Sequence, residues 1–255
     1  MSRIHTLIAI AVYTACLMVA QSVSAEQTRN LDNRANYVQM KTASNQPFNA
    51  YVAGPKDARQ AILLIHGWWG LDQDVETWAN EYAVAGYRVL AVDLYNQQVT
   101  ENPATAKELM QAVKQSDANA KYAAAIQTLS ANGRKVAIIG RSYGATQVLH
   151  AALVAKEKAS AAIVYYPYGE LMTDKQSLAA IKTPILGHFA RKDFFLSLDK
   201  VAEFTSAIKN SGVTMSVNMY EARHGFDSPS SSNFDEAAHQ LAQQRSNEFL
   251  QHYLN

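Results

Sequence analysis

Cysteine is almost absent from this chain of 255 residues, and the only one is Cys16, near the N-terminus. Such a chain can form no internal disulfide, so its stability has to come from a buried core. Charge of one sign is also lacking, since 23 lysines and arginines face 22 acidic residues. This balance excludes the basic surface of a nucleic-acid-binding protein. The sequence has no H-E-x-x-H motif, paired metal-ligand spacing or nucleotide-binding glycine fingerprint, so we expect no metal and no other cofactor.

An apolar run of about 20 residues, the length that spans a bilayer, is missing as well. The longest apolar stretch, residues 6–20, follows Arg3 and precedes Val23-Ser24-Ala25. A basic start, a short apolar core and a small-x-small site are typical of a secretory signal peptide. We expect cleavage near Ala25, export to the periplasm or the medium, and no stable membrane insertion. An uncleaved anchor and a lipid on Cys16 are the alternatives.

The mature chain, residues 26–255, has a length that suits one α/β domain. Short apolar runs alternate with helix-compatible stretches, which predicts an α/β fold with a mostly parallel sheet and helices on both faces. We expect strands at 61–65, 87–92, 136–139, 161–166, 185–189 and 213–220, after an initial pair at 37–41 and 48–52. Helices are expected at 75–85, 104–129 with a break near Asp117, 145–155, 198–210 and 234–253. The short segment between 166 and 193 leaves room for only a minimal lid.

The pentapeptide Gly140-Arg141-Ser142-Tyr143-Gly144 joins an expected strand to an expected helix. This G-x-S-x-G pattern in that context predicts a nucleophile elbow, in which a sharp turn exposes the serine hydroxyl. Glycines on both sides allow the chain to make the turn. Ser142 is therefore the candidate nucleophile.

A nucleophilic serine needs a base and an acidic partner, which in this architecture follow in the order Ser, Asp or Glu, His. Asp193 follows the strand expected at 185–189, and His224 follows the last expected strand. We predict Asp193 as the orienting carboxylate and His224 as the base. An ordinary turn aspartate and a surface histidine are the alternative readings. The rival histidines lie on expected helices, within an expected strand or at a strand end: His150, His239, His252, His188 and His66.

The loop His66-Gly67-Trp68-Trp69-Gly70 follows the first buried strand. Enzymes with a nucleophile elbow bind the developing oxyanion with one backbone N–H from this loop and one from the residue after the nucleophile. Those two donors would be Trp68 and Tyr143. Plain packing of the tryptophans is the alternative.

These segments together resemble the dienelactone hydrolase family of the α/β-hydrolase superfamily. The resemblance runs from about Val38 to the C-terminus. It rests on W-W-G-L at 68–71, A-V-D-L-Y at 91–95, the elbow, K-D-F-F at 192–195 and Y-E-A-R-H-G-F at 220–226. It implies a hydrolase of esters or lactones with a Ser142–Asp193–His224 triad.

Four positions depart from the family pattern. Family members characteristically carry cysteine where this chain has Ser142, and a glutamate where it has Gly67. Members that act on dienelactone hold its carboxylate with two arginines, and the nearest positions here are Gln97 and Ser228. The resemblance therefore implies ester or lactone hydrolysis more than it implies that substrate.

Aromatic side chains follow several expected strands at their carboxyl ends, where ligands bind in such sheets. We expect a substrate pocket bordered, besides Trp68 and Tyr143, by Trp69, Tyr95, Tyr166, Phe194 and Phe226, although half of them could only pack the loops. The predicted partner is a small-molecule ester or lactone. A serine exopeptidase, an acyltransferase, a polyester-degrading enzyme and a catalytically silent binding protein remain alternatives on the same fold.

Overall fold

A computed structural model of the chain describes residues 36–255. The predicted signal peptide, its cleavage site and Cys16 lie outside this range. Within the described residues, no helix combines the length and the apolar character needed to cross a membrane.

Eight strands form a single sheet in the order β1-β2-β4-β3-β5-β6-β7-β8. β1 pairs antiparallel with β2, and β2 pairs antiparallel with β4, whereas all later neighbours are parallel. The strands are β1 (Tyr37–Lys41), β2 (Pro47–Ala53), β3 (Gln60–Ile65), β4 (Arg88–Val92), β5 (Lys135–Arg141), β6 (Ala161–Tyr165), β7 (Ile185–Ala190) and β8 (Met215–Tyr220). The predicted mostly parallel sheet is confirmed.

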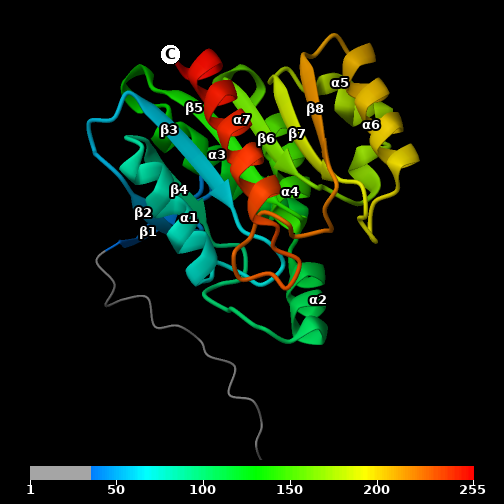
Figure 1. Ribbon diagram of the computed structural model, residues 1–255. Coiled ribbons are helices and arrows are strands. Elements are labelled where there is room, and N and C mark those ends of the chain that lie inside the picture. The colour runs from blue at the N-terminus through cyan, green and yellow to red at the C-terminus, as the bar shows by residue number, and fades with distance from the viewer. Residues whose placement is uncertain (1–35) are drawn as a thin grey trace, which may run out of the picture.

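Helices cover both faces of the sheet, as the continuous apolar runs of the central strands require. In β3, Leu63 packs with the core on one face, while Ile62 and Leu64 pack with the core on the other. α1 and α7 cover one face, and α3, α4 and α6 cover the other (Figure 1). The helices are α1 (Gln73–Val84), α2 (Pro103–Ala112), α3 (Gln115–Leu129), α4 (Tyr143–Ala155), α5 (Lys175–Ala180), α6 (Leu198–Asn210) and α7 (Glu236–Leu254).

The long helix expected at 104–129 is two helices, because Val113 and Lys114 adopt extended backbone angles between them. The break was expected near Asp117, which instead lies in the first turn of α3. A carboxylate there is favoured by the helix dipole, so Asp117 helps α3 begin and does not interrupt it. The short helix α5 was not expected from the sequence.

The parallel strands direct their carboxyl ends to one edge of the sheet. The loops that follow β3, β5, β6, β7 and β8 therefore share that edge, and α2 and the loop between β8 and α7 lie there too (Figure 1). The segment between β6 and β7 holds only a 3₁₀ turn, Glu170–Met172, and α5. A large lid domain is thus absent from the described part of the chain.

Candidate active site

Ser142 is the residue at which β5 turns into α4. Its backbone angles are φ 54° and ψ −121°, in the left-handed half of conformational space that a serine rarely occupies. Its N–H donates a 2.9 Å hydrogen bond to the carbonyl of Tyr165, at the end of β6. The strained turn is therefore tied to the neighbouring strand, and such strain is characteristic of functional sites.

The two glycines of the elbow are required by close backbone contacts. A Cβ atom on Gly140 would lie 2.5 Å from the carbonyl of Gly144. A Cβ on Gly144 would lie 2.3 Å from the carbonyl oxygen of Ile65 and 2.6 Å from that of His66. The elbow is thus pressed against the end of β3, at the loop that was predicted to contribute an oxyanion donor.

The three residues predicted as nucleophile, base and orienter lie together. Nε2 of His224 is 2.8 Å from Oγ of Ser142, and its Nδ1 is 2.8 Å from Oδ2 of Asp193. Because an ionised carboxylate only accepts hydrogen bonds, Nδ1 carries the proton and Nε2 can accept one from Ser142. The Asp193 side chain is fully buried, and its other oxygen accepts the N–H of Phe195 at 2.8 Å.

His224 is held from several sides. The amide of Asn233 donates a 3.0 Å hydrogen bond to the His224 carbonyl. The rings of Tyr166 and Phe195 lie 4.5 and 5.0 Å from the imidazole, centroid to centroid. The imidazole keeps some solvent exposure, at 16% of its side chain. The ring is fixed in orientation and yet remains reachable.

The two predicted oxyanion donors lie on the segments that Gly144 brings into contact. Tyr143 is the first residue of α4, so its N–H has no acceptor within the helix. Within residues 36–255, the Trp68 N–H makes no backbone hydrogen bond. Both donors are thus left without a backbone partner beside the elbow.

His66 holds the loop that carries Trp68. Its Nε2 accepts the Leu94 N–H at 3.1 Å, so its Nδ1 is the protonated nitrogen and donates to the Gly67 carbonyl at 2.7 Å. Burial lowers the pKa of His66, and this keeps the ring neutral and able to accept. This rival histidine fixes the shape of the loop after β3.

The predicted pocket aromatics fall into two groups. Trp69 is half-buried and packs against Trp68, with ring centroids 4.4 Å apart. Tyr95 is buried beside Tyr143, and its hydroxyl has no hydrogen-bond partner among residues 36–255. Tyr166 is buried but contacts His224. Trp69, Tyr95 and Tyr166 thus lie next to groups of the candidate site.

The other two predicted pocket residues lie elsewhere. Phe226 is completely buried and packs against Tyr166 and Tyr220, so it belongs to the core and not to the wall of a pocket. Phe194 is 92% exposed, and the neighbouring Phe195 contacts His224 instead. The hydrogen bond from the Phe195 N–H to Asp193 forms an Asx turn, which brings Phe195 back towards the imidazole.

Tyr168 is a site residue that the sequence analysis missed. Its ring lies 6.3 Å from that of His224 and 6.3 Å from that of Phe195. Thr146 of α4 bonds both its backbone N–H and its carbonyl, at 3.1 and 2.6 Å. The sequence could have indicated Tyr168 through its position, three residues beyond the carboxyl end of β6.

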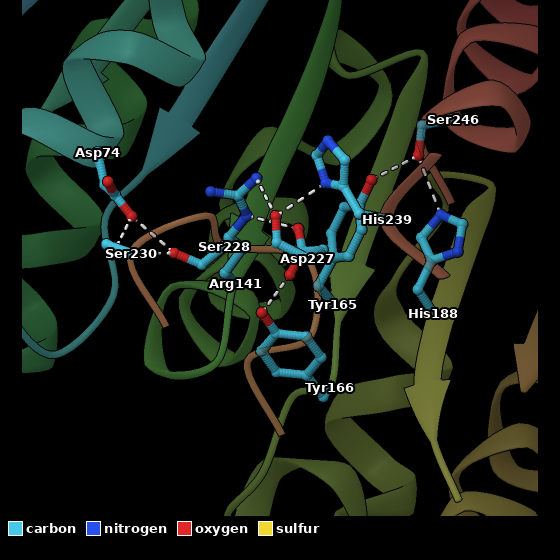
Figure 2. Close-up of polar contacts among 10 residues, drawn as sticks. All are labelled: Asp74, Arg141, Tyr165, Tyr166, His188, Asp227, Ser228, Ser230, His239 and Ser246. Carbon is cyan, nitrogen blue, oxygen red and sulfur yellow. Dashed lines mark hydrogen bonds and ion pairs between the residues drawn. The ribbon is translucent and has the colours of Figure 1, made fainter. Parts of the chain in front are cut away.

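The positions nearest to the carboxylate-binding arginines of the family are engaged within the chain. The Ser228 hydroxyl donates a 2.6 Å hydrogen bond to Asp74 of α1, and Ser230 bonds the same carboxylate (Figure 2). The Gln97 N–H donates to Asp93 at 2.6 Å. Neither position offers a cation to an anionic substrate.

Comparison with known proteins identifies the family of this chain. The model of the dienelactone hydrolase family matches residues 48–254. Carboxymethylenebutenolidase 1 of Cupriavidus pinatubonensis is 27% identical over 233 residues, which cover 84% of this chain and 95% of that protein.

Two solved structures share the fold. A dienelactone hydrolase-like promiscuous phosphotriesterase from metagenomic libraries superposes with a TM-score of 0.73 at 17% identity, over 86% of this chain and 98% of that one. The Pyrococcus furiosus esterase Pf2001 gives a TM-score of 0.63 at 15% identity, over 86% and 92%. The α/β-hydrolase fold and the family match together show that the chain belongs to the dienelactone hydrolase family and is a hydrolase that acts on ester bonds.

Proposed function

We propose that this hydrolase cleaves esters or lactones through an acyl-enzyme on Ser142, with His224 as base and Asp193 as orienter. The observation that carries the proposal is the pair of 2.8 Å contacts that link Ser142 to His224 and His224 to Asp193. A serine becomes nucleophilic when a base takes its proton, and the base works when a third group fixes its tautomer.

In the first half of the reaction, Ser142 Oγ attacks the carbonyl carbon while its proton passes to His224 Nε2. The negative oxygen that forms is stabilised by the N–H groups of Trp68 and Tyr143. The carbon–oxygen bond of the ester then breaks, and the leaving oxygen takes the proton from His224. In the second half, His224 removes a proton from water while the water oxygen attacks the acyl carbon. The bond from that carbon to Ser142 Oγ then breaks, His224 returns the proton to Oγ, and the acid is released.

The proposed substrates are neutral esters with an apolar group near the scissile bond. Aromatic side chains adjoin the site, namely Trp68, Trp69, Tyr168 and Phe195. Ser228 is hydrogen-bonded to a carboxylate, which would disfavour an anionic group placed there.

Two matched p-nitrophenyl esters test this preference, the pentanoate and the monoester of glutarate, which carries a free carboxylate. The pentanoate should be hydrolysed at least about tenfold faster, since one charge contact is worth about 1.4 kcal/mol or more. The opposite preference would sink the neutral-substrate proposal.

The first experiment compares parent and Ser142→Ala on p-nitrophenyl esters of increasing chain length. We expect the variant to lose about 10⁴-fold or more of kcat, because only oxyanion stabilisation and binding remain. Ser211→Ala, which changes a serine at the end of α6, serves as the matched control and should retain full activity.

Labelling by a fluorophosphonate should follow the same pattern, with label on the parent and none on Ser142→Ala. No turnover and no labelling in the parent would favour a silent binding protein. Faster cleavage of peptides than of esters would favour an exopeptidase, and acyl transfer to an added alcohol in preference to water would favour an acyltransferase.

A further inference from the structure

A buried ion pair joins the elbow to the loop that carries His224. Arg141 immediately precedes Ser142, and Asp227 follows His224 by three residues. Arg141 Nε lies 2.6 Å from Asp227 Oδ2, and a second guanidinium nitrogen donates to the Asp227 carbonyl at 3.2 Å (Figure 2). The two side chains are only 13% and 2% exposed. The pair thus links the segments that hold the nucleophile and the base.

Further groups converge on this pair. The Tyr166 hydroxyl donates to the second oxygen of Asp227, and His239 of α7 donates from Nδ1 to its carbonyl at 2.9 Å. The Arg141 guanidinium lies 3.7 Å from the centre of the Trp78 ring on α1. Burial, and then the negative charge of Asp227, raise the pKa of Tyr166 well above its usual value, so the phenol stays a donor. Every polar group of the Asp227 side chain therefore has a partner.

The network also reaches the imidazole. The ring of Tyr166, fixed at its hydroxyl end by Asp227, lies 4.5 Å from that of His224. Arg141 is the chain neighbour of Ser142, at the end of β5. Asp227 is thus linked through Arg141 to Ser142 and through Tyr166 to His224, the two residues that make the 2.8 Å contact.

Stability alone does not account for the pair. Replacing a buried ion pair by apolar residues is often neutral or stabilising, because the two charges must be desolvated. Removing one partner is strongly destabilising, since the other charge stays buried. Such a pair can instead select one arrangement of the segments that it joins.

We propose that Arg141 and Asp227 are positioning residues that set the alignment of Ser142 with His224. The proposal rests on the proposed serine mechanism. A displacement of about 1 Å between reacting groups can cost about 100-fold in rate, so the pair should affect kcat more than KM.

The test separates positioning from stability. Arg141→Met, Asp227→Leu and the double variant are compared with the parent for Tm, kcat and KM. Ser230→Ala is the matched control, because it removes a hydrogen bond of the same loop to Asp74 without touching the ion pair. We expect the double variant to be more stable than either single variant, while its kcat stays about 10- to 100-fold below the parent with KM within about threefold. Ser230→Ala should keep kcat within about twofold.

A kcat that recovers together with Tm in the double variant would overturn the proposal, as would an equal loss in Ser230→Ala. A readout independent of turnover is the proton NMR signal of His224 Nδ1–H, which should be sharp in the parent and in Ser230→Ala and broadened in the double variant. An unchanged signal in the double variant would also overturn the proposal. Failure of the serine mechanism itself would give a different result, because Ser142→Ala would then have the same kcat as the parent. The NMR comparison would still show whether the Arg141–Asp227 pair orients His224.

Discussion

His188 and His224 lie in different surroundings, one within β7 and the other on the loop that follows β8. His188 lies on β7, completely buried, with Nδ1 2.8 Å from the Tyr220 hydroxyl and Nε2 2.9 Å from the Ser246 hydroxyl. His224 follows the next strand and contacts the carboxylate of Asp193 and the hydroxyl of Ser142. A carboxylate stabilises a positive charge on the ring that it contacts, whereas two hydroxyls do not.

Burial decides the protonation of His188. Burial, and then the positive charge of the nearby Arg245, together lower the pKa of His188 to about 3. His188 therefore stays neutral at physiological pH and works as a hydrogen-bonded core residue. The comparison teaches that two features distinguish a candidate base from a structural histidine: the group that contacts Nδ1, and the exposure of the ring to solvent. The position of the residue along the strand is less informative.

The largest effect that would test this comparison is expected from His224→Gln. The variant should lose about 10⁴-fold or more of kcat with little change in Tm, because the base is removed from a site that is not fully buried. His188→Gln is the matched control and should do the reverse, losing about 2 kcal/mol of unfolding free energy while kcat stays within about threefold. Ester hydrolysis and urea denaturation on both variants check this, and comparable activity losses in the two would break the distinction.

Asp193→Asn should have the next largest effect, a loss of about 10⁴-fold in kcat. The side-chain amide of this variant would donate to Nδ1 of His224, which favours the tautomer of His224 that has its proton on Nε2. A protonated Nε2 can no longer accept a hydrogen bond from Ser142. The amide oxygen can still accept the Phe195 N–H, so the loop should keep its shape and Tm should change little. If kcat falls by less than about tenfold, Asp193 does not set the tautomer.

The smallest effect concerns the pH dependence of stability. The pKa of His188 is about 3 in the folded protein and about 6.5 when unfolded, so the unfolded state binds more protons between these values. His188 thus contributes stability that is fully present above about pH 6.5 and is lost as pH falls towards 3, by about 1.4 kcal/mol per pH unit. Urea denaturation between about pH 7 and pH 4 should show a shallower loss for His188→Gln than for the parent. Equal slopes would mean that His188 is protonated in the fold.

Patterns of apolar residues predicted the sheet well, because the central strands are buried on both faces and have few polar interruptions. Ser142, Asp193 and His224 come together as their chain order predicts, because strand ends in a parallel sheet meet at one edge. The sequence could not show which of Phe194 and Phe195 contacts His224, since this depends on one hydrogen bond from the Phe195 N–H to Asp193. The burial of Phe226 likewise depends on its packing against Tyr166 and Tyr220.

Arg141 and Asp227 escaped the sequence analysis for a related reason. The motif G-x-S-x-G treats the position of Arg141 as free, and Asp227 lies just beyond the histidine segment. Their pairing joins residues 86 positions apart, which no local pattern can indicate. A charged residue between an apolar strand and a nucleophile was the available sign that a buried partner exists.

The arrangement of the strands has a consequence for the order in which the chain can become active. From β3 to β8 the sheet grows outward as β3-β5-β6-β7-β8, so each strand after β5 is laid beside the strand synthesised just before it. The outermost strand, β8, leads directly to His224 and to Asp227. If His224 is the base, as proposed, a ribosome-bound chain that ended before it would hold Ser142 and Asp193 without a base. Hydrolysis by the proposed mechanism can therefore begin only when almost the whole chain has been made.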